Sequence, residues 1–195
     1  DSSLDGYGIV IAPQLYLMRN GFATRAEAFV SSGGTFVATY LTGIANETDL
    51  VFAGGLPGPM RKLLGIRSEE TDYLYDDERN TLRIADGAPH GLAGEFALAT
   101  VCDVIRAETA EVVGTYGGDF YAGRPALTVN RFGKGEAWYI ASCGADGRML
   151  DALYGALAKA CGIASALPDC ALPEGATAQV RSNASGEYVF VMNFN

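Results

Sequence analysis

The chain has 195 residues, of which 49% are hydrophobic, so it can bury one ordinary core. Its 14 Lys and Arg residues against 23 Asp and Glu residues give a net charge of -9, which repels phosphate backbones and anionic membrane surfaces. No apolar run approaches the roughly 20 residues of a membrane span, and no signal-like segment opens the chain. We therefore expect a cytoplasmic domain with neither nucleic acid nor membrane as a partner.

The cysteines are widely spaced and show no CxxC pattern. They are Cys102, Cys143, Cys161 and Cys170. This spacing favours reduced thiols in or near the core over disulfides or a zinc site.

The first elements predict a parallel sheet. Ile9–Ala12 is a short continuous apolar run that ends at Pro13, the pattern of a strand buried on both faces. Apolar residues then recur at helical spacing over residues 22–30, and the β-rich run 35–40 follows a Gly-Gly stop. We expect a right-handed strand–helix–strand unit.

Residues 41–65 are rich in Gly and Pro and predict an irregular excursion from the sheet, where binding surfaces usually lie. Two prolines stiffen its last part, which also carries a compact apolar set beside an arginine, a residue type enriched in interface cores. We predict a subunit or interdomain interface formed by Pro57, Pro59, Met60, Arg61, Leu63 and Leu64. The alternative is that the leucines cap the core of this domain.

The rest of the chain predicts further strands and one long helix. Two weak strands over 71–84 surround a polar turn, another strand covers 111–116, and residues 126–142 form a hairpin. Asp146 then caps a helix that ends at Gly162. Its apolar stripe is Met149, Leu150, Leu153, Leu157 and Cys161.

A domain boundary is expected between residues 164 and 174, where helical periodicity stops and Pro168 and Pro173 appear. We predict an α/β domain over 1–165, and a linker with the beginning of a β domain over 166–195. The absence of a leading Met and the end inside an apparent strand indicate an excised piece. We expect the first strand and helix of the α/β domain to be missing, which would leave the strand at Ile9 as an edge.

No catalytic, cofactor-binding or metal-binding residues are predicted. The single histidine, His90, lies in an Ala-Pro-His-Gly loop, and the strand-to-helix elbow at Thr42 carries neither Ser nor Cys. The chain therefore resembles a class I glutamine amidotransferase-like domain without its reactive Cys. Glu47 follows Asn46, as the acid/base residue of many retaining glycosidases follows an Asn, but that chemistry needs two carboxyls about 5 Å apart on a barrel. We assign Glu47 to a loop.

Long segments of the chain resemble the middle, trimerisation domain of family 42 β-galactosidases. They are YGIVIAPQLY at 7–16, GGTFVATY at 33–40, FAGGLPGPMRKLLGI at 52–66, DFYAGRPALT at 119–128 and NRFGKGEA at 130–137. The resemblance spans almost the whole chain, and the hairpin after Pro173 is similar to the start of the family's C-terminal β domain. The catalytic barrel of the family is missing from this chain, so no catalytic residue is carried over.

The resemblance implies a parent enzyme that hydrolyses terminal β-D-galactosides as a homotrimer. This domain would contact other domains and subunits of that parent and would bind no cofactor. The expected fold is a flavodoxin-like (class I glutamine amidotransferase-like), mainly parallel sheet flanked by helices, followed by a short antiparallel β segment. The alternative function is an amidotransferase-like enzyme or a small-molecule-binding domain that uses the carboxyl ends of its strands.

Overall fold

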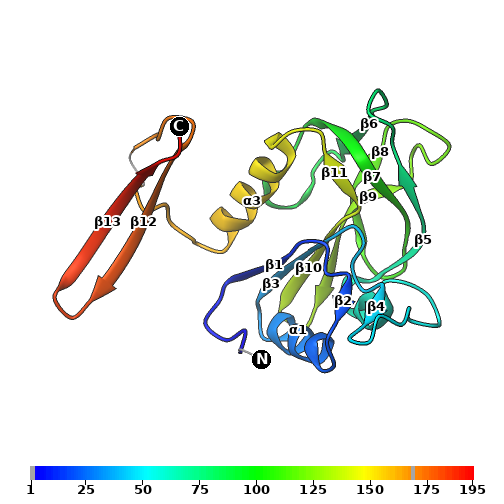
Figure 1. The fold of residues 1–195 in the computed structure, drawn as a ribbon, viewed down its shortest axis with the longest axis horizontal. Helices are drawn as coiled ribbons and strands as arrows, with labels where there is room; N and C mark the ends of the chain where they lie inside the picture. The colour runs from blue at the N-terminus through cyan, green and yellow to red at the C-terminus, as the bar shows by residue number, and fades with distance from the viewer. Residues whose placement is uncertain (1–2, 168–169) are drawn as a thin grey trace. The chain divides into compact units, whose positions relative to one another are not determined.

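The computed structural model describes residues 3–167 and 170–195 and divides the chain into two compact units (Figure 1). The first unit is Asp1–Cys161 and the second is Gly162–Asn195. Pro168, one of the two prolines that mark the predicted boundary, lies outside the described residues.

The first unit begins with a parallel group of strands, β1 (Ile9–Ala12), β3 (Thr35–Thr39) and β10 (Gly135–Ile140). β3 lies between the other two and is buried at every position, as a continuous apolar run requires. The helix α1 (Phe22–Ser31) connects β1 to β3, so the predicted strand–helix–strand unit is present. β1 is the edge strand on this side of the sheet.

The remainder of the sheet is antiparallel. β9 (Pro125–Phe132) pairs with β10 through the predicted hairpin, and the order then continues through β8, β6, β7 and β11, with β5 beside β7. The bounds of these strands are β5 Ile66–Tyr73, β6 Asn80–Ile84, β7 Glu95–Ala107, β8 Glu111–Tyr116 and β11 Ser142–Gly144.

The prediction of a flavodoxin-like, mainly parallel sheet flanked by helices is wrong. Parallel neighbours need a crossover connection of about a dozen or more residues, usually a helix. From β5 to β10, however, each strand is joined to the next in the chain by a short connection without an α-helix. The 13-residue strand β7 organises this half, because β5, β6 and β11 all pair with it. β5 and β6, expected to flank one polar turn, each pair with β7. The result is a β-rich domain with a mixed sheet.

Two helices cover opposite faces of the parallel strands (Figure 1). From α1, Phe22 packs against Phe36 of β3 with ring centroids 6.3 Å apart. On the other face lies α3 (Arg148–Ala160). Its predicted apolar stripe is buried at Met149, Leu153 and Leu157, but Leu150 is half-buried and Cys161, just after the helix, is exposed. The remaining elements of this unit are short: β2 (Leu17–Met18), β4 (Ala45–Asn46), η1 (Gly58–Met60), α2 (Arg61–Leu64) and η2 (Pro89–Gly91).

The second unit contains the predicted antiparallel hairpin, formed by β12 (Ala176–Asn183) and β13 (Gly186–Asn193). Alternate residues of a strand point to opposite faces. Large apolar side chains of β13 are exposed on both faces: Tyr188, Val189, Phe190 and Val191.

A buried carboxylate joins the two halves of the first unit. Asp103 of β7 is 1% exposed and accepts hydrogen bonds from the Tyr139 hydroxyl at 2.6 Å, the Thr71 hydroxyl at 2.7 Å and the Leu41 amide at 3.0 Å. These donors come from β10, β5 and the turn after β3. Burial raises the pKa of the Asp103 carboxyl above its ordinary value, and the hydrogen bonds from Tyr139, Thr71 and the Leu41 amide only partly oppose this shift.

Removing this carboxylate should destabilise the chain in a pH-dependent way. We expect Asp103→Ala to lower the free energy of unfolding by about 3 kcal/mol, because it leaves several buried donors unpaired. Tyr139→Phe removes only one of these hydrogen bonds and should lower it by about 1 kcal/mol. Since the pKa of Asp103 is raised on folding, its contribution is largest below the unfolded pKa and falls as pH rises through the folded value. Urea unfolding of wild type and Asp103→Ala should therefore show a larger difference near pH ~4 than near pH ~7. A difference that grows toward neutral pH would contradict this account.

Candidate functional site: the 41–65 loop and its pocket

The irregular region predicted at residues 41–65 is a loop pinned to the body of the domain at several points. The Gly43 amide donates to the Leu15 carbonyl at 2.8 Å, and the Ile44 amide donates to the Tyr16 carbonyl at 3.1 Å. At Gly43, with φ +66°, a Cβ atom would lie 2.3 Å from the Pro57 carbonyl oxygen. Only glycine therefore permits the two ends of the loop to approach this closely.

The six predicted interface residues do not form one surface. Met60, Leu63 and Leu64 are fully buried in the core of the first unit, and Pro57 is also buried. Pro59 is exposed, and the Arg61 side chain is 34% exposed. The interface role stays a prediction, and only Pro59 and Arg61 can act in it by direct contact.

Arg61 makes a two-pronged ion pair with Glu108. Its Nε donates to Glu108 Oε2 at 2.8 Å, Nη2 donates to Oε1, and Nη1 donates to the Gly54 carbonyl at 3.2 Å. The hydrogen bond from Arg61 lowers the pKa of Glu108 and keeps it ionised. This fork geometry holds the guanidinium at one place beside the loop.

More arginines surround this pair and form a surface that we call the arginine ridge, defined by Arg61, Arg67, Arg106 and Arg124. Arg67 of β5 is directly opposite Arg106 of β7 in the strand register, and Arg124 donates to Glu69 at 2.7 Å. These guanidinium groups lower the pKa values of Glu69 and Glu108. The ridge is thus a basic patch on a chain with a net charge of -9.

Of the four arginines in the ridge, sequence patterns indicated Arg61 alone. Arg67 and Arg106 come together only through the pairing of β5 with β7, and no local motif indicates that register. The frequent charged residues along residues 66–73 were the available signal of an exposed strand, but they do not indicate which strand lies beside it.

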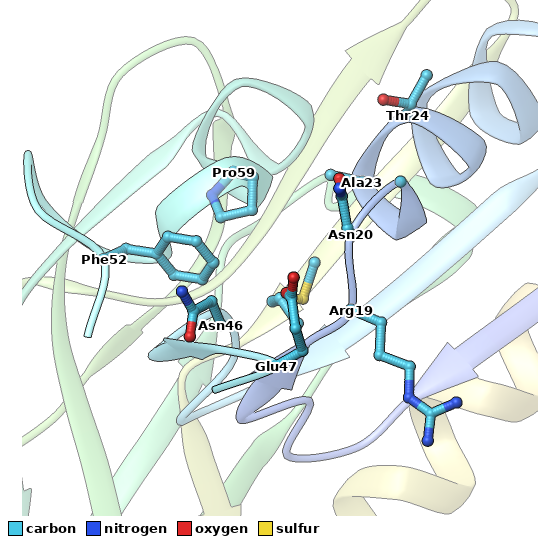
Figure 2. A pocket seen from close by; sticks show the side chains of 10 residues that line it. Arg19, Asn20, Ala23, Thr24, Asn46, Glu47, Phe52 and Pro59 are labelled. Atoms are coloured by element: carbon cyan, nitrogen blue, oxygen red, sulfur yellow. The ribbon is translucent and has the colours of Figure 1, made fainter. Parts of the chain in front are cut away.

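A pocket of about 330 Å³ lies between the loop and the start of α1 (Figure 2). Glu47 and Phe52 come from the loop, whereas Asn20 and Thr24 come from the opposite wall. The complete lining is Met18, Arg19, Asn20, Gly21, Ala23, Thr24, Asn46, Glu47, Phe52 and Pro59. These residues lie far apart in the sequence and meet because β2 pairs with β4.

Asn46 organises the loop wall of this pocket. Its Oδ1 accepts hydrogen bonds from the Thr48 amide at 2.9 Å, the Thr48 hydroxyl at 2.8 Å and the Leu50 amide at 3.0 Å. The side chain therefore closes a turn around Glu47 and fixes the backbone from which that carboxylate projects.

His90 belongs to a packing cluster. Its Nε2 lies 2.9 Å from Glu136 Oε2, which also accepts from Trp138 Nε1 at 2.9 Å. Burial raises the pKa of Glu136, but the hydrogen bonds from His90 and Trp138 outweigh it and leave a net lowering. In the part of the chain that the structure describes, no Ser or Cys side chain hydrogen-bonds to His90.

Two side chains of nucleophilic type, Thr42 and Cys102, have ordinary structural roles. The Thr42 hydroxyl donates to the Thr39 carbonyl at 2.7 Å. Burial raises the pKa of the Cys102 thiol to about 11, so it stays protonated near neutral pH and is a poor nucleophile.

Within residues 3–167 and 170–195, no three His, Cys, Asp or Glu residues are grouped in a way that could hold a metal ion. In the same residues no helix is both long enough and apolar enough to cross a membrane.

The fold defines the class: a β-rich domain built on a mixed sheet. Residues 1–164 match the family model described as the β-galactosidase trimerisation domain. The chain belongs to this family, the trimerisation domain of family 42 β-galactosidases, as its sequence resemblance indicated.

Relatives with this domain are named β-galactosidases. The chain is 47% identical to β-galactosidase BglY of Alicyclobacillus acidocaldarius over 194 residues and 46% identical to β-galactosidase Pbg of Clostridium perfringens over 195 residues. The crystal structure of the β-galactosidase from Rahnella sp. R3 matches with a TM-score of 0.93 at 47% identity. In each comparison the match covers 100% of this chain but only 28% of the other protein.

The role of Asn46 can be tested by hydrogen exchange. We expect Asn46→Ala to speed exchange of the Thr48 and Leu50 amides by about tenfold, because each hydrogen bond that it makes is worth about 1 kcal/mol or more. Thr24→Ala, on the opposite wall, is the matched control and should leave both rates unchanged. Equal exchange in wild type and Asn46→Ala would show that the turn holds without the side chain.

Proposed function

We propose that the protein containing this chain hydrolyses terminal β-D-galactosides as a homotrimer, and that this domain supplies contacts between its subunits. The observation that carries the proposal is the match of residues 1–164 to the trimerisation-domain family, together with relatives named β-galactosidases at up to 47% identity. The chain spans about 28% of the length of those relatives, so the catalytic groups belong to the rest of the protein.

The surface that we propose for subunit contact is the arginine ridge with Pro59. Arg61 is paired with Glu108 and Arg124 with Glu69, and the positive charge of Arg67 and Arg106 beside them suits an acidic partner surface. Another copy of a chain with a net charge of -9 offers such surfaces. A cyclic trimer needs two different complementary patches on each subunit, and the ridge would be one of them.

We further propose that the second unit opens a larger β domain. A two-stranded hairpin by itself is at best marginally stable in water, and three or more strands with an apolar face are needed for independent stability. The exposed apolar residues on both faces of β13 support a role in such a domain.

We also place the protein in the cytoplasm, because Cys102, Cys143, Cys161 and Cys170 are all free thiols.

The contact surface can be tested by charge reversal in the full-length protein. We expect Arg61→Glu to convert the trimer to smaller species, measured by light scattering during size-exclusion chromatography, because a reversed charge meets the acidic partner surface. Arg83→Glu is the matched control, since Arg83 forms another exposed pair, with Glu95 at 3.2 Å.

A second variant separates subunit contact from repulsion within the domain. Arg61→Glu with Glu108→Arg restores an ion pair of reversed polarity inside one subunit. If Arg61 contacts the neighbouring subunit, the double variant stays dissociated. Recovery of the trimer would assign the effect to the pair with Glu108, and an unchanged trimer in Arg61→Glu would remove Arg61 from the interface.

The division of labour makes a separate prediction about activity. The full-length protein should hydrolyse nitrophenyl β-D-galactopyranoside, and the 195-residue chain should show no turnover, because retaining hydrolysis needs two carboxyls about 5 Å apart on a catalytic scaffold. Turnover by the isolated chain that is abolished by Glu47→Gln would overturn this expectation. Inactivity of the full-length protein on β-galactosides would refute the proposed reaction.

A further inference from the structure

We propose that the pocket between the loop and α1 binds one pyranose ring of a neutral saccharide. This inference rests on the proposed function, which brings galactosides and galactose to the protein, but it assigns a site away from the catalytic groups. The cavity of about 330 Å³ lies at the small end of the range of about 300–1,000 Å³ that ligand sites occupy. It is therefore of a size for a single ring with its hydroxyl groups.

The charges around the pocket favour a neutral ligand. The Glu47 carboxylate projects among the lining side chains, whereas the Arg19 guanidinium turns away at the rim (Figure 2). A carboxylate inside the pocket repels phosphate and other anions. The nearby guanidinium offsets the attraction for cations, and the lining of the pocket contains no carboxylate besides Glu47.

The polar groups of the lining can both donate and accept hydrogen bonds, as sugar hydroxyls require. Glu47 offers two acceptor oxygens, whereas the Thr24 hydroxyl and the Asn20 side-chain amide can each donate and accept hydrogen bonds. The Oδ1 atom of Asn46 is already engaged by Thr48 and Leu50, which leaves its Nδ2 as a donor with a fixed position. In Figure 2 this nitrogen lies on the side of Asn46 that faces the Phe52 ring.

Phe52 supplies the apolar wall. One face of a pyranose ring presents C–H groups, and an aromatic ring can pack against that face while the hydroxyls around the edge form hydrogen bonds. Phe52 is held in place because it packs closely on Gly58, where a Cβ atom would lie 2.5 Å from Phe52 Cδ2. The ring is thus ordered before a ligand arrives, and its half-buried position leaves part of its surface open to the pocket.

Saturation-transfer NMR on the 195-residue chain tests this inference, with methyl β-D-galactopyranoside as the probe. We expect a saturation signal and a Kd of about 1–10 mM, an affinity typical of few contacts. Phe52→Ala and Glu47→Ala should each weaken binding at least tenfold. Phe120→Ala is the matched aromatic control, since Phe120 is 71% exposed and does not line the pocket, and it should bind as wild type does.

Each other outcome overturns the proposal. Absence of a signal from wild type, or equal binding by Glu47→Ala and wild type, would exclude a saccharide site here. Glu47→Ala is included because Glu47 is exposed and its removal should not disturb folding. Circular dichroism checks the folding of Glu47→Ala and Phe52→Ala. Displacement of the galactoside by inorganic phosphate or methylammonium at equal concentration would identify a charged ligand instead. The trimer and the hydrolysis are measured on the full-length protein, so either proposal can fail without the other.

Discussion

The structure of the first unit depends on one buried carboxylate. Asp103 lies where the parallel and antiparallel halves of the sheet meet, and it binds donors from β10, β5 and the turn after β3. The same turn starts the 41–65 loop, and Leu41 there has φ +58°, a conformation that a non-glycine residue adopts at some cost. The hydrogen bond from the Leu41 amide to Asp103 offsets that cost. The direction in which the loop leaves the sheet is therefore determined in the core and not on the surface.

Local patterns were enough for those elements whose pairing is also local. The apolar run Ile9–Ala12, the helical spacing over 22–30, the hairpin over 126–142 and the stripe of α3 all predicted structure that is present. β7 was missed because EFALATVCDVIRA combines alanines with β-branched residues and has no clear period of two. Without β7, the strands over 71–84 and 111–116 had no identified partner, and the strand–helix–strand unit over residues 9–40 decided the fold class. The fold class was wrong for that reason, since it depended on pairing between residues far apart in the chain.

The candidate site shows the same limit. Residues 57–64 were predicted to form an interface because Pro, Gly and apolar residues cluster there. In the structure Met60, Leu63 and Leu64 belong to the core, and Arg61 lies on a basic surface. Glu47 was correctly placed in a loop but was weighed only as a catalytic acid. Its position in a pocket depends on the pairing of Leu17 with Ala45, which brings the start of α1 to the loop. Composition can identify a binding region, but the side chains that meet there depend on strand register.

The close approach of Gly43 to Pro57 has a consequence for the entropy of binding. Because both ends of the intervening segment are held against each other, residues 44–56 form a nearly closed ring whose backbone is already restricted in the unbound state. A flexible loop loses about 1–2 kcal/mol of conformational entropy per residue when it becomes ordered on a partner. A loop closed in advance loses much less, so even a small number of weak contacts to a sugar or a neighbouring subunit can give measurable affinity.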